Sequence, residues 1–243
     1  MLVDELQLFR GKDYKVNDYI IIHQPTLGEI CDFGEQRYFS MISTICATPS
    51  EYKVQLYDMG IDYEELDEFE FFIMLTKTLK AEDTNIILGD VDLSRLIPLQ
   101  DKNTNEIFLY DGSTGAIVDF LAYTLITDFL RKIHGFKKQV DRTGNAATKQ
   151  IIIDTERRRL ERHKNDKYKS VLIPLISAMI NCENFKYNHE TVWSLPIYVF
   201  MDSVRRIQKI KNYEHIMQGA YSGCVDLSKI PKDDLNWLGS IND

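Results

Sequence analysis

The sequence predicts a mainly α protein with a small β element, an α+β chain with a helical bundle-like body. Three observations support this prediction: few helix-breaking residues, capping residues placed before apolar stretches, and one pattern typical of a β-hairpin. The 243 residues include only 6 Pro and 12 Gly, which favours long uninterrupted helices. Hydrophobic residues make up 44% of the chain, a normal share for a globular protein.

Capping signals place the helices of the N-terminal third. Residues 14–23 precede them and read as one strand, because they are rich in β-branched and aromatic side chains. Thr26 is followed three residues later by Glu29, which predicts a capping box. Helices are expected over residues 26–34, 35–47, 48–60 and 61–80.

The middle of the chain changes character. Residues 93–118 combine strand-like stretches with polar turns, which predicts a β-hairpin. The helical pattern then returns over residues 119–134, 146–164, 170–182 and 190–218. The last of these helices is expected to bend near Pro196, and the apolar helix before it is expected to be buried.

Residues 136–145 are basic and polar, and they form a candidate domain boundary or mobile loop. A chain of this length suits one large domain or two small ones. We expect a single domain over residues 1–243. The alternative is a division into an acidic α+β part, residues 1–135, and a basic helical part, residues 146–243.

The two halves of the chain carry opposite charge. Residues 1–130 contain 24 Asp and Glu against 9 Lys and Arg, and residues 131–243 contain 13 against 20. The net charges are therefore −15 and +7. Such a division favours ordered contact between acidic and basic faces, either within one molecule or between molecules.

No catalytic signature is present in the sequence. It contains no glycine-rich phosphate loop, no HExxH zinc motif and no GxSxG elbow. Cys224 as a nucleophile would need a histidine such as His215 close by, and its neighbours read better as a turn between helices. A zinc site built from Cys182, His189 and Cys224 follows no known ligand spacing. We therefore expect a protein that is not an enzyme and that needs no metal or cofactor.

Contact with other proteins is the expected activity, and three groups of residues are candidates for it. These are the acidic residues Glu64, Glu65, Asp67 and Glu68, the basic residues Arg157, Arg158 and Arg162, and the aromatic residues Tyr221 and Trp237 of the tail. Each group also has a structural interpretation: a solvated helix start, ion pairs along a helix surface, and anchors that dock the tail onto the body. Self-association into a homo-oligomer remains open.

Nucleic acid and membranes are not expected partners. The basic run offers the best nucleic-acid candidate, but interleaved acidic residues neutralise much of it along the helix. The isoelectric point of about 5.2 argues against general phosphate affinity. No basic N-terminal region precedes a long apolar run, and the apolar residues 171–180 are half a membrane span. A cytosolic protein is expected.

Two segments of the chain resemble known proteins. The first runs from Ile22 to Ile30 and continues through Gly34 to Ser50, and the second runs from Met217 to Asp226 and continues to Trp237. Together they are similar to proteins encoded in the tail-morphogenesis regions of long-tailed phages that infect Gram-positive bacteria. Such proteins are commonly described as tail assembly chaperones.

The resemblance implies a non-enzymatic protein that binds the tape-measure protein and helps the tail tube polymerise around it. Chaperones of this kind act in the cytoplasm of the bacterial host and are generally absent from the finished virion. One alternative is a structural virion protein of the neck or tail, and a further alternative is a nucleic-acid-binding module. The resemblance implies no catalytic residues.

Overall fold

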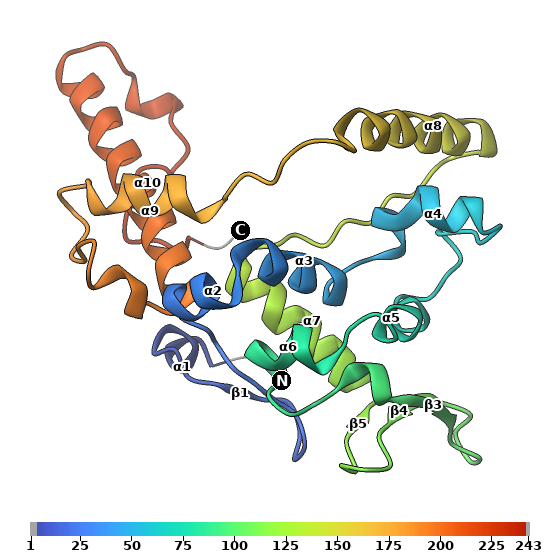
Figure 1. The fold of residues 1–243 in the computed structure, drawn as a ribbon. Helices are drawn as coiled ribbons and strands as arrows, with labels where there is room; N and C mark the ends of the chain where they lie inside the picture. Colours follow the sequence, from blue (N-terminus) through green and yellow to red (C-terminus); the bar gives the residue numbers. More distant parts are fainter. Residues whose placement is uncertain (1–3, 242–243) are drawn as a thin grey trace.

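The computed structural model describes residues 4–241, and Figure 1 shows the course of the chain. Within the described residues it contains ten α-helices and two small antiparallel sheets, and 53% of those residues are helical. The predicted fold class, mainly α with a small β element, is confirmed. No helix among these residues has both the length and the apolar character needed to cross a bilayer.

The elements follow one another along the chain in three stretches. The first holds α1 (Glu5–Phe9), β1 (Tyr14–Lys15), β2 (Ile21–Ile22), α2 (Leu27–Phe33), α3 (Glu35–Ile45), α4 (Lys53–Asp58), α5 (Glu68–Thr76) and α6 (Ala81–Leu88). The second holds β3 (Ile97–Gln100), β4 (Ile107–Tyr110), β5 (Ile117–Val118) and α7 (Phe120–His134). The third holds α8 (Ala146–His163), α9 (Leu172–Ile180) and α10 (Ile197–Tyr221).

Capping residues define several helix ends, and the capping box predicted at Thr26 is present. Thr26 and Glu29 form a reciprocal capping box at the start of α2, which satisfies two backbone donors that the helix leaves free. Asp119 caps α7 by accepting a hydrogen bond from the Ala122 amide, and Gly135 ends this helix in the left-handed conformation. The predicted β-hairpin over residues 93–118 is also present, as the antiparallel sheet β3-β4-β5.

Residues 14–23 do not form the single strand that their composition predicts. They form two short strands, β1 and β2, which pair antiparallel across a turn. The side-chain oxygen of Asn17 accepts hydrogen bonds from the amides of Tyr19 and Ile20. An asparagine bonded to the backbone ahead of it stabilises a turn, and this turn divides the predicted strand.

The helix predicted over residues 61–80 is also shorter than expected. Asp67 accepts hydrogen bonds from the amides of Phe69 and Glu70 and so begins α5 at Glu68. Glu64 and Glu65 therefore lie in the preceding turn, which Asp62 stabilises by accepting from the Glu64 amide. The acidic run is a turn followed by a helix cap, not a continuous helix start.

The C-terminal helices differ from expectation in burial and in shape. Helix α9 is only half buried, since Leu172, Ile176 and Met179 are buried while Ile173 is 67% exposed. Pro196 does not bend α10 but precedes it as the N-cap residue, where a proline costs the helix no hydrogen bond. The backbone on either side of Pro196 pairs with the start of α2: Leu27 donates to the Leu195 carbonyl, and Ile197 donates to the Pro25 carbonyl.

Two apolar clusters form the interior. The larger one contains residues of α2, α3 and α7 together with Leu172, Ile176 and Phe200 from the third stretch of the chain. The smaller one joins α4, α5 and α8, with Ile153 of α8 fully buried against Val54, Leu56 and Phe71. Helix α8 thus packs on the N-terminal part of the chain, and Figure 1 shows it beside α4 and well apart from α9 and α10.

The C-terminus of α10 closes with a turn that requires glycine. Gly223 has a φ of +75°, and the amides of Cys224 and Gly223 donate to the carbonyls of Gly219 and Ala220. This pattern is a Schellman motif. A Cβ added at Gly223 would meet no other described atom within 4 Å, so any cost of a side chain there comes from the backbone conformation.

Replacing Gly223 by alanine is expected to lower the free energy of unfolding by about 1 kcal/mol, because an L residue is disfavoured in the left-handed region. Gly144 is the matched control, since it also has open space around it and lacks a positive φ. Gly144→Ala is expected to leave stability unchanged or slightly higher. Urea denaturation measures both variants, and equal stabilities would contradict this interpretation of the turn.

Candidate functional site

The acidic and basic runs of the sequence meet each other inside one molecule. Lys149 of α8 forms ion pairs with Asp62 and with Glu64, the latter at 3.1 Å. Arg157 of α8 pairs with Asp58 at 2.6 Å. The hydrogen bond from Lys149 holds the pKa of the Asp62 carboxyl below its ordinary value. Part of the acidic N-terminal stretch and part of the basic C-terminal stretch therefore pair with each other within the molecule.

The ion pairs flank the apolar contact that holds α8 in place. Lys149, Ile153 and Arg157 are spaced four residues apart and so lie on one face of the helix. Ile153 belongs to the smaller apolar cluster, while Lys149 reaches Asp62 in the turn before α5 and Arg157 reaches Asp58 at the end of α4. The predicted partner-binding residue Arg157 thus has an internal role, and so does Glu64.

Residues 136–145 lie against the N-terminal part of the chain. The Asp141 carboxylate pairs with Lys53 of α4, whose side chain is buried, and the Asp141 amide donates to Ser50. The Thr48 hydroxyl donates to the Gln139 carbonyl at 2.7 Å. We call residues 136–145 the strap, because they contain no helix or strand and are held by these contacts.

The remaining predicted contact residues have varied surroundings. Glu68 pairs with Lys138 of the strap at 2.7 Å, and Asp67 caps α5. Arg158, Arg162 and Glu65 are exposed, and none of the three forms an ion pair with a described residue. Three of the seven acidic and basic candidates, Glu64, Glu68 and Arg157, are therefore paired within the molecule, each with an oppositely charged residue that was not itself a candidate.

The two aromatic candidates lie apart: Tyr221 is the last residue of α10, while the tail folds back so that Trp237 lies beside Arg206 in the first half of that helix. Tyr221 is 84% exposed and Trp237 is 40% exposed. The tail after α10 is held through its backbone, because Arg206 donates to the carbonyls of Trp237 and Gly239. The ring of Tyr221 is therefore not the anchor that docks this tail onto the body.

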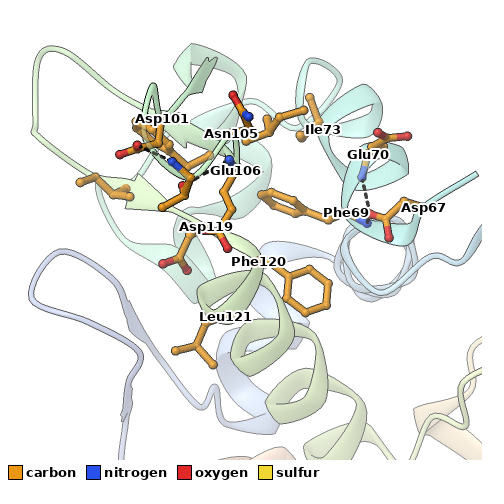
Figure 2. A pocket seen from close by; sticks show the side chains of 14 residues that line it. Asp67, Phe69, Glu70, Ile73, Asp101, Asn105, Glu106, Asp119, Phe120 and Leu121 are labelled. Atoms are coloured by element: carbon orange, nitrogen blue, oxygen red, sulfur yellow. Dashed lines mark hydrogen bonds between the residues drawn. The ribbon is translucent and has the colours of Figure 1, made fainter.

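One hollow on the described surface was not predicted from the sequence. It is a groove of about 750 Å³ between α5, the turn from β3 to β4, and the start of α7 (Figure 2). Its lining residues are Asp67, Phe69, Glu70, Ile73, Asp101, Thr104, Asn105, Glu106, Ile107, Phe108, Ile117, Asp119, Phe120 and Leu121. We call it the acidic groove, because five of these side chains are carboxylates and none is Lys, Arg or His.

Three of the five carboxylates stabilise backbone turns. Asp67 and Asp119 cap α5 and α7, and Asp101 accepts from the amides of Asn103 and Thr104. These backbone hydrogen bonds hold the pKa of Asp101 below its ordinary value. The other two, Glu70 and Glu106, are exposed and have no hydrogen-bonding or ionic partner for their carboxylates among the described residues.

The floor of the acidic groove is apolar. Phe69 is buried there, and its ring packs edge-on against Phe120 with centroids 6.2 Å apart. Phe120 and Leu121 are 59% and 62% exposed, although they begin a helix whose later residues form core. Figure 2 shows the rings of Phe69 and Phe120 together, with Glu70 on one side and Glu106 on the other.

A second hollow of about 660 Å³ lies between α1, α10 and the C-terminal tail. It is also largely apolar at its base, with exposed Leu6 and Phe9 at its rim. Its charged lining residues are of both signs, Glu5 and Asp202 against Lys186 and Arg206. This hollow therefore lacks the single-sign potential of the acidic groove.

Ligand clusters suited to a metal are not found among residues 4–241: no group of three or more His, Cys, Asp or Glu side chains is placed to hold an ion. Cys224 lies in the turn after α10, where its thiol faces the Ser222 carbonyl. Neither hollow contains a histidine or a cysteine. The acidic groove can therefore bury the apolar side chains of a ligand, and its carboxylates surround that ligand with a negative potential.

Comparison with known proteins gives one match. A family model described as the YomV second domain matches residues 164–242, and this family is of a phage type, from Bacillus prophage. The match includes α9, α10 and the tail, and it contains the second of the two phage-like segments, Met217 to Trp237. No curated protein and no solved structure matches the chain. The expected similarity to phage proteins is confirmed at this general level.

Proposed function

We propose that this chain is a non-enzymatic phage protein that binds other proteins during virion morphogenesis, as a tail assembly chaperone. The observation on which the proposal rests is the acidic groove. Apolar side chains such as Phe120 and Leu121 lie exposed inside a set of carboxylates. An exposed apolar patch with a polar rim is typical of a surface that binds a protein partner.

Two further observations support the proposal. The segments around Ile22–Ile30 and Met217–Asp226 resemble tail-morphogenesis proteins, and residues 164–242 are similar to a phage-type domain. The internal ion pairs of α8 involve Asp58, Asp62 and Glu64, while the carboxylates of Glu70 and Glu106 have no partner among the described residues and are open to an external one. The proposed partners are the tape-measure and tail-tube proteins of the same phage, in the cytoplasm of the host.

Co-purification tests this function. The tagged chain is produced together with the tape-measure and tail-tube proteins and is recovered at low salt. Wild-type chain is expected to retain at least one of the two partners. Glu70→Lys/Glu106→Lys is expected to retain at least about tenfold less, because like charges then face a basic partner across the groove. No capture by the wild-type chain would contradict the function.

Mass spectrometry of purified phage particles separates the chaperone from its structural alternative. A chaperone is expected to be absent from finished particles or present only in traces. Stoichiometric presence in the particles would instead favour a structural protein of the neck or tail. Either result leaves the partner-binding role of the acidic groove to the co-purification experiment.

A further inference from the structure

We propose that the occupant of the acidic groove is a basic amphipathic α-helix of the partner protein. The inference rests on the proposed function and specifies the chemistry of the partner at that site. It follows from the sign of the charge around the groove, from the apolar floor, and from the absence of a usable strand edge.

The charge requires a basic partner. Glu70 projects from α5 and Glu106 from the turn after β3, so the two carboxylates without partners lie on opposite sides of the floor (Figure 2). Asp67, Asp101 and Asp119 add negative charge around them, and no lining residue is cationic. Lysine or arginine side chains on both sides of a docked segment would find carboxylates there.

The floor requires apolar side chains between those cations. Phe120 and Leu121 leave more than half of their side chains in solvent, and Ile107 and Ile117 are 39% and 38% exposed at the same groove. The volume of about 750 Å³ lies within the range of about 300–1,000 Å³ that is usual for binding pockets. It suits a few side chains from one face of a helix rather than a folded domain.

A helix fits the groove better than an added strand. Two strands border the groove, and β4 is the central strand, already paired on both sides. The edge strand at the groove is β5, which has only two residues, and the Ile117 carbonyl is already occupied by the side-chain amide of Asn17 at 3.0 Å. The other edge strand, β3, contributes no residue to the lining. Recognition by strand addition needs a free edge. A helix that inserts residues at positions i, i+3, i+4 and i+7 does not.

Three synthetic peptides test this inference on the full chain. The first forms an amphipathic helix with a leucine face flanked by lysines. The second has glutamate in place of every lysine, and the third has the first peptide's composition in an order that destroys the apolar face. Fluorescence anisotropy measures binding, and circular dichroism measures helix formation on binding.

The first peptide is expected to bind and to gain helicity, the second is expected not to bind, and the third is expected to bind at least about tenfold more weakly. Glu70→Lys/Glu106→Lys is expected to weaken the first peptide at least about tenfold, and Leu121→Ser is expected to weaken it by a smaller factor. The matched control is Glu183→Lys/Glu214→Lys, which makes the same charge change at two exposed residues outside the groove. It is expected to leave binding unchanged.

The inference would be overturned if the first and third peptides bind equally well, or if the control variant weakens binding of the first peptide as much as the groove variant does. Either result would indicate unspecific electrostatic attraction. A second copy of the chain would be the occupant if the first peptide does not bind, the chain self-associates, and Arg158→Glu/Arg162→Glu abolishes that self-association. This result would also overturn the inference. The proposed function can fail separately. If the chain binds the first peptide but captures no tail protein, only the proposed function is contradicted. If the chain captures a tail protein and Glu70→Lys/Glu106→Lys captures it equally well, only the assignment of the binding site to the acidic groove is contradicted.

Discussion

Asp141→Asn is expected to lower the free energy of unfolding by about 3 kcal/mol, because it leaves a buried ammonium group without its anion. The Lys53 side chain is only 6% exposed, and Asp141 of the strap is its ion-pair partner. Removing one member of a buried pair costs more than the pair itself contributes, since the remaining charge stays out of water. Urea denaturation at neutral pH measures the change.

Two controls isolate the buried charge in this experiment. In Lys53→Met/Asp141→Asn both charges are gone, and the double variant is expected to regain part of the lost stability. Asp18 also pairs with a lysine, Lys15, but both side chains are largely exposed, so Asp18→Asn is expected to leave stability unchanged. A double variant that is less stable than Asp141→Asn would contradict the account of the strap.

Acidification is expected to destabilise the protein through His134. This imidazole is fully buried at the end of α7, where its Nδ1 donates to the Leu130 carbonyl and its Nε2 accepts from the Tyr38 hydroxyl at 2.6 Å. Burial lowers the pKa of His134 to about 4. Tyr38 is buried as well, and burial raises the pKa of its hydroxyl, which keeps that group a hydrogen-bond donor.

The direction of the effect follows from the lowered pKa of His134. The unfolded chain takes up this proton near pH 6.5 and the folded chain only near 4, so the stabilisation is complete above the higher value and is lost as pH falls towards the lower one. Between about pH 7 and about pH 5 the loss is expected to be about 2 kcal/mol. Most carboxylates stay ionised over that interval, which separates their contribution from that of His134.

Chemical denaturation at these two pH values measures the loss. Tyr38→Phe/His134→Leu removes the titrating group together with its partner, and its stability is expected to change much less between the two pH values. The same pH dependence in the double variant and in the wild-type chain would show that another group is responsible.

Local signals in the sequence predicted much of the secondary structure. Thr26 with Glu29, and Asp119 with Gly135, determine helix ends through hydrogen bonds to nearby backbone. The burial of α9 was predicted wrongly, because its composition is apolar on all sides while only one face meets the core. The bend at Pro196 was predicted wrongly because pairing with α2 ends the preceding segment at that residue.

The acidic groove could not be predicted from local patterns. It combines residues 67–73, 101–108 and 117–121, and the acidic residues among them read individually as turn and cap residues. One local signal pointed to it: the apolar pair Phe120 and Leu121 directly follows the N-cap residue Asp119. Two large apolar side chains are unusual in the first turn of a helix when that turn is exposed to solvent. The charge polarity of the sequence was informative, but it could not show that Lys149 and Arg157 pair within the molecule.

The central claim is that the chain contacts a tail protein through the acidic groove, and site-specific photo-crosslinking tests it most directly. A photoreactive residue is placed at Leu121 in one variant and at Tyr221 in a second, and each is produced together with the tape-measure and tail-tube proteins. The account predicts a crosslink from position 121 to a lysine- or arginine-rich helical segment of one of those proteins. Crosslinks to those proteins from position 221 with none from position 121 would contradict it.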